Sequence, residues 1–443
     1  MISRIYEHYN GRALKKEYDF EGDLSFNEDY SKQFYRKSRN EIIDCFRIYS
    51  NNETKTHAIS NSYFVGVDWI IEKKKAIYIQ PKLNEYSEDE TDYLQMLFSA
   101  LKHEEVSKHT VELFEIKWDK PTIAITQQED LLTPLLIVQF LTLVKQIVRK
   151  GLKKSYYKVE NNLHSKVKGK VLVSQTIKQN LVKNKPLRTF CSYDEFGFNG
   201  LENRLLKKAL SFVERYLPTI KNLQTDDYTA EIFNYINPAF QFVSEEVSLY
   251  DVNNTKTNVF YKEYKEAIHL AKLILKRFGY NVSNIQEKTI NTPPFWIDMS
   301  KLFELYVYGK LKERFPLKND VKYLFKTNYQ ELDFIIDSKL ENYQMVVDAK
   351  YKPQYKDGNI NKEDIRQVSG YARMKSVYKE LHKENNYNQV IDCLIIYSDQ
   401  GAGRKDFANV NFREETEDNY VQFYKIGIEL PTLIVNNHTK KSL

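Results

Sequence analysis

The sequence predicts a multidomain α+β protein with a small N-terminal α+β domain, a mostly helical middle and a C-terminal α/β domain. Three observations lead to this prediction. The chain has 443 residues, more than a single hydrophobic core usually supports. Apolar residues form strand-like runs within residues 1–115 and recur at helical spacing within residues 116–285. Within residues 286–443, helical and strand-like segments alternate, as is typical of α/β folds.

The first two regions differ in the period of their apolar residues. Residues 1–115 contain short apolar runs between polar turns, such as SYFVGVDWII and KAIYIQPKL, followed by DETDYLQMLFSAL with helical spacing. Residues 116–285 contain longer helical patterns, such as TPLLIVQFLTLVKQIVRKGL and ENRLLKKALSFVERYL. A small mixed domain followed by a mostly helical one is the expected arrangement.

The C-terminal region predicts the order helix, three strands, helix, strand. Ser300 is suited to cap the helix KLFELYVYGKLKERF, and VKYLFKTNY predicts the first strand. Two further strands are expected in ELDFIIDSKLENYQMVVDAKYKP, residues 331–353. The amphipathic segment KEDIRQVSGYARMKSVYKEL then leads into VIDCLIIYS, an apolar run typical of a strand buried on both faces.

Cysteine usage and hydropathy exclude several classes of protein. Only three cysteines occur, Cys45, Cys191 and Cys393, widely separated and each in an apolar or mixed segment, so neither a disulfide framework nor a CxxC metal site is expected and a reducing, cytoplasmic location is indicated. The first residues lack the apolar stretch of a signal peptide. The most apolar segment, residues 131–144, is shorter than the roughly 20 residues of a spanning helix, so we expect a core helix and no membrane association.

Three charges stand in the two strands of residues 331–353, where a buried hairpin should carry none. Because strand side chains alternate, Asp348 and Lys350 project from one face, and Asp333 on the preceding strand can lie beside them. Two carboxylates at a strand pair suit Mg²⁺, so Asp333 and Asp348 are predicted metal ligands. Lys350 would orient water or stabilise negative charge during phosphodiester hydrolysis. The alternative interpretation is a structural buried ion pair.

An acid two residues before a lysine is common in so charged a chain, and most such pairs are expected to be exposed. Asp348–Lys350 differs because it ends the apolar run MVV and because an upstream strand carries Asp333. The pairs that lack this setting are Glu72–Lys74, Glu115–Lys117, Glu263–Lys265 and Asp337–Lys339.

Phrases along most of the chain carry a family resemblance. They are IYIQPKL with LQMLFSAL near the start, RKGLKKSYYKVENNLHSKVKGKV with CSYDEFGFNGLENRLLKKAL in the middle, and FELYVYGKL with VVDAKYKP near the end. Together with the element order and the Asp333, Asp348 and Lys350 set, they resemble the McrC family, the nuclease subunits of modified-cytosine restriction systems within the PD-(D/E)xK superfamily. Leu332 stands where that superfamily has a proline before the first aspartate, but proline is not a ligand and the chemistry should survive.

The resemblance implies two further site residues. Glu304 in LFELY occupies the place of the first-helix glutamate that supports the metal site in this superfamily, with a solvated helix charge as the alternative. Gln367 occupies a place near the metal site, and it shares a helix face with Tyr371, for which helix packing is the alternative.

Positive charge concentrates in the middle region. The net charge of +6 permits a polyanionic partner without requiring one. A surface that follows DNA phosphates and a solvated lysine-rich face are equally expected from this pattern. The residues are Lys145, Arg149, Lys150, Lys153, Lys154, Lys166, Lys168, Lys170, Lys178, Lys183, Lys185 and Arg188.

The resemblance implies a Mg²⁺-dependent endodeoxyribonuclease subunit that cuts double-stranded DNA in a GTP-dependent, methylcytosine-directed restriction system. No GxxxxGK[ST] loop occurs in the chain, so GTP would be bound by a separate AAA+ GTPase resembling McrB, which this chain would also stimulate. Residues 1–115 would dock that partner, and residues 116–285 are a candidate for DNA contact, with the solvated lysine-rich face as the alternative. A self-sufficient nuclease of DNA repair or phage defence and a non-catalytic GTPase-activating adaptor are the alternatives. The intact Asp333, Asp348 and Lys350 argue against the adaptor.

Overall fold

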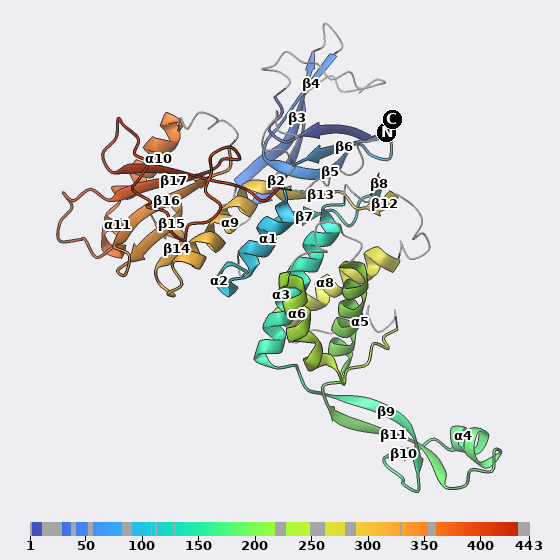
Figure 1. Ribbon diagram of the computed structural model, residues 1–443. Helices are drawn as coiled ribbons and strands as arrows, with labels where there is room; N and C mark the ends of the chain where they lie inside the picture. Colours follow the sequence, from blue (N-terminus) through green and yellow to red (C-terminus); the bar gives the residue numbers. More distant parts are fainter. Residues whose placement is uncertain are drawn as a thin grey trace, which may run out of the picture. The chain divides into compact units, whose positions relative to one another are not determined.

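The computed structural model forms two compact units (Figure 1). One contains Met1–Leu131 together with Lys288–Leu443, and the other contains Leu132–Glu287. The pattern of the sequence instead places the two ends of the chain in different domains. The structure describes residues 2–10, 29–36, 41–51, 56–81, 91–107, 109–110, 113–126, 130–217, 227–248, 262–279, 289–327, 330–352 and 360–432.

The N-terminal part of the first unit is built from three small sheets. Trp296 and the phenylalanines Phe34, Phe46 and Phe64 lie in one buried cluster with aliphatic residues of the larger sheets. The five-stranded sheet has the order β1 (Ile2–Tyr6), β6 (Lys75–Gln80), β5 (Phe64–Ile71), β13 (Phe295–Asp298) and β7 (Phe114–Ile116). The three-stranded sheet contains β2 (Tyr30–Arg36), β3 (Glu41–Asn51) and β4 (Thr56–Asn61), and the third pairs β8 (Ile123–Thr126) with β12 (Thr289–Thr292).

Strand β13 explains why the two ends of the chain belong to one unit. It pairs antiparallel with β5 on one side and β7 on the other, and all four of its residues are buried. Residues 295–298 therefore complete an N-terminal sheet, although they fall within the predicted C-terminal domain. A fragment ending before residue 286 would lack this strand.

Helix α9 (Met299–Arg314) follows β13 directly and is buried on nearly every side. Its N-cap is Asp298, whose carboxylate accepts a hydrogen bond from the Lys301 amide at 2.9 Å, so the prediction of Ser300 as the cap is wrong. Helix α1 (Tyr93–Leu101), which is followed by α2 (Glu104–Ser107), packs closely against α9. A Cβ atom at Gly309 would lie only 3.0 Å from Ala100 Cα, so a larger residue would push the two helices slightly apart.

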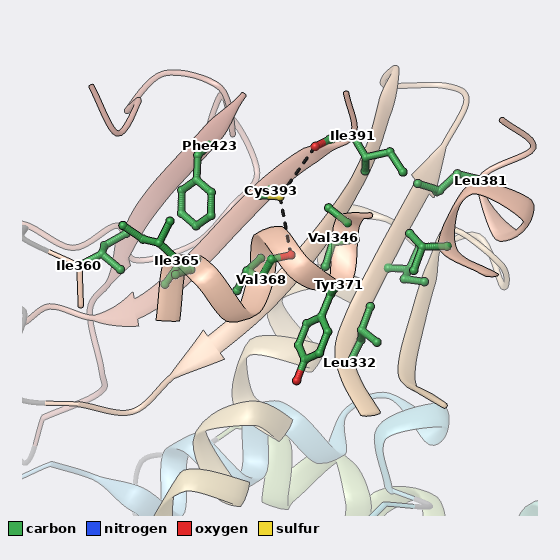
Figure 2. Packing of buried hydrophobic residues seen from close by; sticks show 14 of the residues in the cluster. Leu332, Val346, Ile360, Ile365, Val368, Tyr371, Leu381, Ile391, Cys393 and Phe423 are labelled. Atoms are coloured by element: carbon green, nitrogen blue, oxygen red, sulfur yellow. Dashed lines mark hydrogen bonds between the residues drawn. The ribbon is translucent and has the colours of Figure 1, made fainter. Parts of the chain in front are cut away.

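The C-terminal part contains a mixed five-stranded sheet with the order β14 (Val321–Thr327), β15 (Gln330–Ser338), β16 (Tyr343–Lys350), β17 (Asp392–Ser398) and β18 (Phe423–Ile428). The first three strands are antiparallel, and β16, β17 and β18 are parallel. Helices α10 (Lys362–Ala372) and α11 (Lys375–Glu380) pack on a buried cluster that includes Val346, Val368 and Tyr371 (Figure 2). The predicted order of helix, three strands, helix and strand is observed, and α11 and β18 extend it.

The second unit contains helices and one long hairpin. Helices α3 (Leu132–Lys150), α5 (Leu201–Tyr216), α6 (Asp227–Ile236) and α8 (Lys262–Gly279) pack together, with a 3₁₀ turn, η4, at Asn237–Phe240. Helix α3 is apolar and long enough to span a membrane by composition, but 67% of its apolar window is buried. The prediction of a core helix in this segment is thereby confirmed.

A hairpin extends from these helices within the second unit (Figure 1). Strands β9 (Ser155–His164) and β11 (Arg188–Gly197) pair over their full length, with β10 (Lys170–Val171), α4 (Val173–Thr176) and the π-helical turn η2 (Ile177–Leu181) between them. Buried Asn203 holds its base by donating hydrogen bonds to the carbonyls of Lys153 and Phe198. The prediction of a mostly helical middle did not include this hairpin.

Candidate active site

Asp333, Asp348 and Lys350 lie together on the face of the sheet that α10 covers. The register pairs Phe334 with Val347, so Asp333 and Asp348 face each other at the next position. Asp333 Oδ2 accepts a hydrogen bond from the Ala349 amide at 2.9 Å. Lys350 Nζ lies 2.8 Å from Asp348 Oδ2. The structure therefore brings the three predicted residues to one place.

Strand β14 is irregular opposite Asp333. Its pairing with β15 passes from Tyr323–Phe334 to Phe325–Leu332, and Leu324 between them has a φ of 54°. This left-handed conformation is uncommon for leucine and marks a local interruption of the ladder. The pairing with β14 is thus interrupted beside the carboxylate.

Burial dominates the electrostatics of the two aspartates. Asp333 is 8% exposed and Asp348 is 3% exposed. Burial raises the pKa of Asp348 above its ordinary value, and this effect outweighs the attraction of Lys350. Burial disfavours the charged form of Lys350, but Asp348 and Asp333 outweigh it and raise the pKa of the lysine. Lys350 is therefore a fixed positive charge at neutral pH.

Glu304 on α9 is buried, only 3% exposed, so the alternative of a solvated helix charge is wrong. The Tyr323 hydroxyl donates to Glu304 Oε2 at 3.2 Å, and Lys301 Nζ lies 3.6 Å from the same oxygen. Burial and Lys350 have the largest effects on the pKa of Asp348. The negative charge of Glu304 has a smaller effect, which also raises that pKa. Glu304 therefore belongs to the electrostatic surroundings of the aspartates.

Gln367 links Lys350 to helix α10. Lys350 Nζ donates to Gln367 Oε1 at 3.1 Å, and Gln367 Nε2 donates to the Tyr371 hydroxyl at 2.7 Å. The Tyr371 ring packs in the cluster under α10, and its hydroxyl points away from the aliphatic side chains (Figure 2). Tyr371 thus combines the predicted helix packing with a hydrogen bond to Gln367.

Asp364 is a residue that sequence reasoning missed. It is buried on α10, accepts hydrogen bonds from Lys352 Nζ at 2.8 and 2.9 Å, and lies 3.9 Å from Lys350 Nζ. The signal was present in the sequence, because Asp364 precedes Gln367 by three residues and therefore shares its helix face. Both lysines after Asp348 are thus paired with carboxylates.

The carboxylates fit a Mg²⁺ site that relies partly on water. The described residues contain no group of three or more His, Cys, Asp or Glu side chains able to hold a metal. Mg²⁺ commonly binds proteins through one or two carboxylates and keeps several waters. Asp348 Oδ2 is buried, and the Lys350 ammonium lies 2.8 Å from it, so this oxygen already faces a positive charge. Such an oxygen suits a cation.

The raised pKa of Asp348 predicts that its charge destabilises the metal-free fold. A folded-state pKa above the unfolded value means that the stability contribution is present at low pH and lost as pH rises through the folded pKa. Asp348→Asn should therefore raise the Tm by a few degrees in EDTA at about pH 7, and the difference should vanish near about pH 4. Calorimetry across this range checks it. A lower Tm for the variant at neutral pH would show that the ion pair with Lys350 dominates instead.

The fold and the site define a mixed α/β multidomain protein in which two buried aspartates and a partly buried lysine lie together on one sheet. The chain belongs to the family described as McrBC 5-methylcytosine restriction system component, whose model matches residues 62–382. This confirms the resemblance found in the sequence at the level of the McrBC family.

Comparison with curated proteins gives no significant match. Among solved structures, the chain is similar to one in a refined half-complex from the tetradecameric assembly of Thermococcus gammatolerans McrB AAA+ hexamers with bound McrC. The identity is 18%, the match covers 97% of this chain and 94% of that chain, and the TM-score is 0.38. A chain of the Thermococcus gammatolerans McrBC complex matches at 17% identity, with 73% and 89% covered and a TM-score of 0.29.

Proposed function

We propose that this chain is the nuclease subunit of a McrBC-type restriction system, acting in the cytoplasm as a Mg²⁺-dependent endodeoxyribonuclease with a PD-(D/E)xK core. One observation carries the proposal, namely that the buried Asp333 and Asp348 and the partly buried Lys350 lie together on neighbouring strands. Family membership and the element order of the C-terminal part support it. The test is cleavage of methylated double-stranded DNA with Mg²⁺, which EDTA should stop.

The residues have distinct roles in this proposal. Asp333 and Asp348 would hold Mg²⁺, which when bound polarises a phosphoryl oxygen and acidifies a water molecule. Lys350 places a permanent positive charge beside the attacking water or the charge that develops on the phosphate. Gln367 and Asp364 hold its ammonium group in position. Glu304, held by Tyr323, adds negative charge that favours cation binding.

A separate AAA+ GTPase is the proposed partner, and GTP would bind to that partner. In the Thermococcus assembly, McrC is bound to McrB AAA+ hexamers. Docking through residues 1–115 stays a prediction, and the hairpin of the second unit offers another surface. Large apolar side chains are exposed along it, which is typical of interaction sites. They include Tyr156, Val167, Val173, Leu181, Val182, Leu187 and Phe196.

The hairpin also carries exposed lysines, which favours contact with DNA phosphates. If they bind DNA, replacing Lys166, Lys170, Lys183 and Lys185 by glutamine should weaken binding. The affinity of the variant should also depend less on salt. The slope of the logarithm of the binding constant against the logarithm of the salt concentration should become shallower by about 0.9 for each phosphate that the variant no longer neutralises. Fluorescence anisotropy between about 50 and 200 mM salt measures this slope.

Exposed lysines outside the hairpin provide the control. Lys73→Gln with Lys339→Gln removes two exposed charges from the first unit and should leave the slope near wild type. If the four-lysine variant of the hairpin binds DNA normally but no longer stimulates the GTPase, the hairpin is a binding site for the GTPase and not for DNA.

A further inference from the structure

Tyr351 connects the C-terminal sheet to the N-terminal strands at the point where β16 ends. It follows Lys350 directly, and its hydroxyl donates a 2.7 Å hydrogen bond to Oε1 of Glu7. Both side chains are buried, with exposed fractions of 3% and 4%. The Tyr351 ring centroid lies 5.7 Å from that of Phe303, the neighbour of Glu304 on α9. Tyr351 therefore adjoins Lys350 along the chain and packs against α9, the helix that carries Glu304.

Glu7 is fixed in the N-terminal sheet. Its amide donates to the Gln80 carbonyl at 3.0 Å, just after the parallel pairing of β1 with β6. The amide of the next residue, His8, donates to the Ser62 carbonyl at 3.0 Å, and its ring centroid lies 5.9 Å from that of Tyr351. His8 has a φ of 56°, an uncommon conformation for histidine that these contacts maintain. The acceptor of the Tyr351 hydrogen bond therefore has a defined position.

A second buried polar contact joins the N-terminal sheets to α9. Arg36 on β2 donates from Nε to Asp298 Oδ2 at 2.7 Å, and Asp298 is the N-cap of α9. Directed polar interactions thus connect the N-terminal strands both to the end of β16, which carries Lys350, and to α9, which carries Glu304. Apolar contacts alone would leave their alignment less specific.

We propose that Glu7 and Tyr351 are positioning residues through which the N-terminal sheet sets the location of Lys350. The inference rests on the proposed nuclease function. A buried polar pair adds little net stability compared with apolar side chains of the same size, but it has direction. The hydrogen bond fixes Tyr351 and, through the backbone, the adjacent Lys350. A displacement of the N-terminal sheet would therefore be transmitted to the lysine.

Two variants separate positioning from stability. Tyr351→Phe keeps the ring contacts and removes only the hydroxyl, so kcat for Mg²⁺-dependent cleavage should fall about 10- to 100-fold with KM for DNA unchanged. Tyr351→Phe alone leaves Glu7 without this hydrogen bond and should lower the Tm. The double variant with Glu7→Met removes both polar partners, so its Tm should return toward the wild-type value while kcat stays low. Glu7→Gln keeps an acceptor oxygen and should stay near wild type. Amide hydrogen exchange over residues 343–352 should be faster in the Tyr351→Phe and double variants.

Tyr378→Phe is the matched control. Tyr378 lies on α11, which packs on the same sheet, and its buried hydroxyl donates to the Gln389 carbonyl at 2.7 Å. The substitution removes only this hydroxyl. It should change neither kcat nor exchange at 343–352. Recovery of kcat by the double variant, with exchange as in the wild type, would overturn the proposal. If the wild-type chain proves unable to cleave DNA, the nuclease function fails, while the exchange comparison still decides whether Glu7 positions β16.

Discussion

Asp333→Asn, Asp348→Asn and Lys350→Met should each reduce Mg²⁺-dependent DNA cleavage by a factor on the order of 10³ or more, because each removes a charge that the reaction uses. The substitutions preserve shape. Asparagine at position 333 can still accept the hydrogen bond from the Ala349 amide, so a fall in activity would report the missing charge rather than a broken strand pair. Initial rates on supercoiled plasmid with partner, GTP and Mg²⁺ provide the measurement.

The pair Asp337–Lys339 is the matched control because it repeats the spacing of Asp348–Lys350 at the end of the neighbouring strand β15. Asp337 is half-buried and accepts a hydrogen bond from Gln344 Nε2 at 2.9 Å, and Lys339 is exposed. Asp337→Asn with Lys339→Met should cleave at nearly the wild-type rate. Retained cleavage by Asp348→Asn, in a protein that folds normally, would reject the site assignment.

The proximity of Asp333, Asp348 and Lys350 could be predicted because strand alternation is a strong local rule. Asp348 and Lys350 had to share a face, and antiparallel pairing of two adjacent strands brought Asp333 opposite them. The setting of the candidate residues beyond these strands depended on packing. Whether Glu304 is buried or solvated follows from the helices and sheets around α9, which no spacing in the sequence specifies.

Long-range pairing explains what the sequence could not predict. Strand β13 has only four residues, and its place between β5 and β7 depends on segments more than 170 residues away. The hairpin of β9 and β11 was not predicted because polar and apolar residues are mixed along its strands, in which only Cys191 and Ser192 are buried. The helix cap at Asp298 was missed because Asp298 and Ser300 are both suitable cap residues, and the place where β13 ends decides between them.

The surroundings of Lys350 bear on how the proposed activity would be controlled. Its ammonium is held by Asp348, Gln367 and Asp364, and its neighbour Tyr351 is held by Glu7. Three of these contacts lie within the C-terminal sheet and its helix, whereas Glu7 belongs to the N-terminal strands. In the proposal, the contact with Glu7 is therefore a route through which a partner bound to the N-terminal strands would affect the lysine.

The isolated chain should cleave DNA slowly, and addition of the AAA+ GTPase with GTP should raise the rate about 100-fold, near the upper end of typical coupling between sites. Contacts of exposed lysines with phosphates carry no sequence information, so the chain alone should bind methylated and unmethylated duplexes equally. Reading a modified base generally requires a pocket for a flipped nucleotide, and the 58 Phe and Tyr residues are spread through the whole chain without a compact aromatic cassette.

The decisive assay compares methylated and unmethylated duplexes with Mg²⁺, each with and without the partner and GTP. The Asp348→Asn chain is the internal control, because it should still accelerate GTP hydrolysis by the partner while cleaving nothing. Efficient cutting of methylated DNA by the isolated chain would favour a self-sufficient nuclease. Stimulated GTP hydrolysis without any cleavage by the wild-type chain would favour a non-catalytic adaptor, and the buried aspartates would then be a structural ion pair with Lys350.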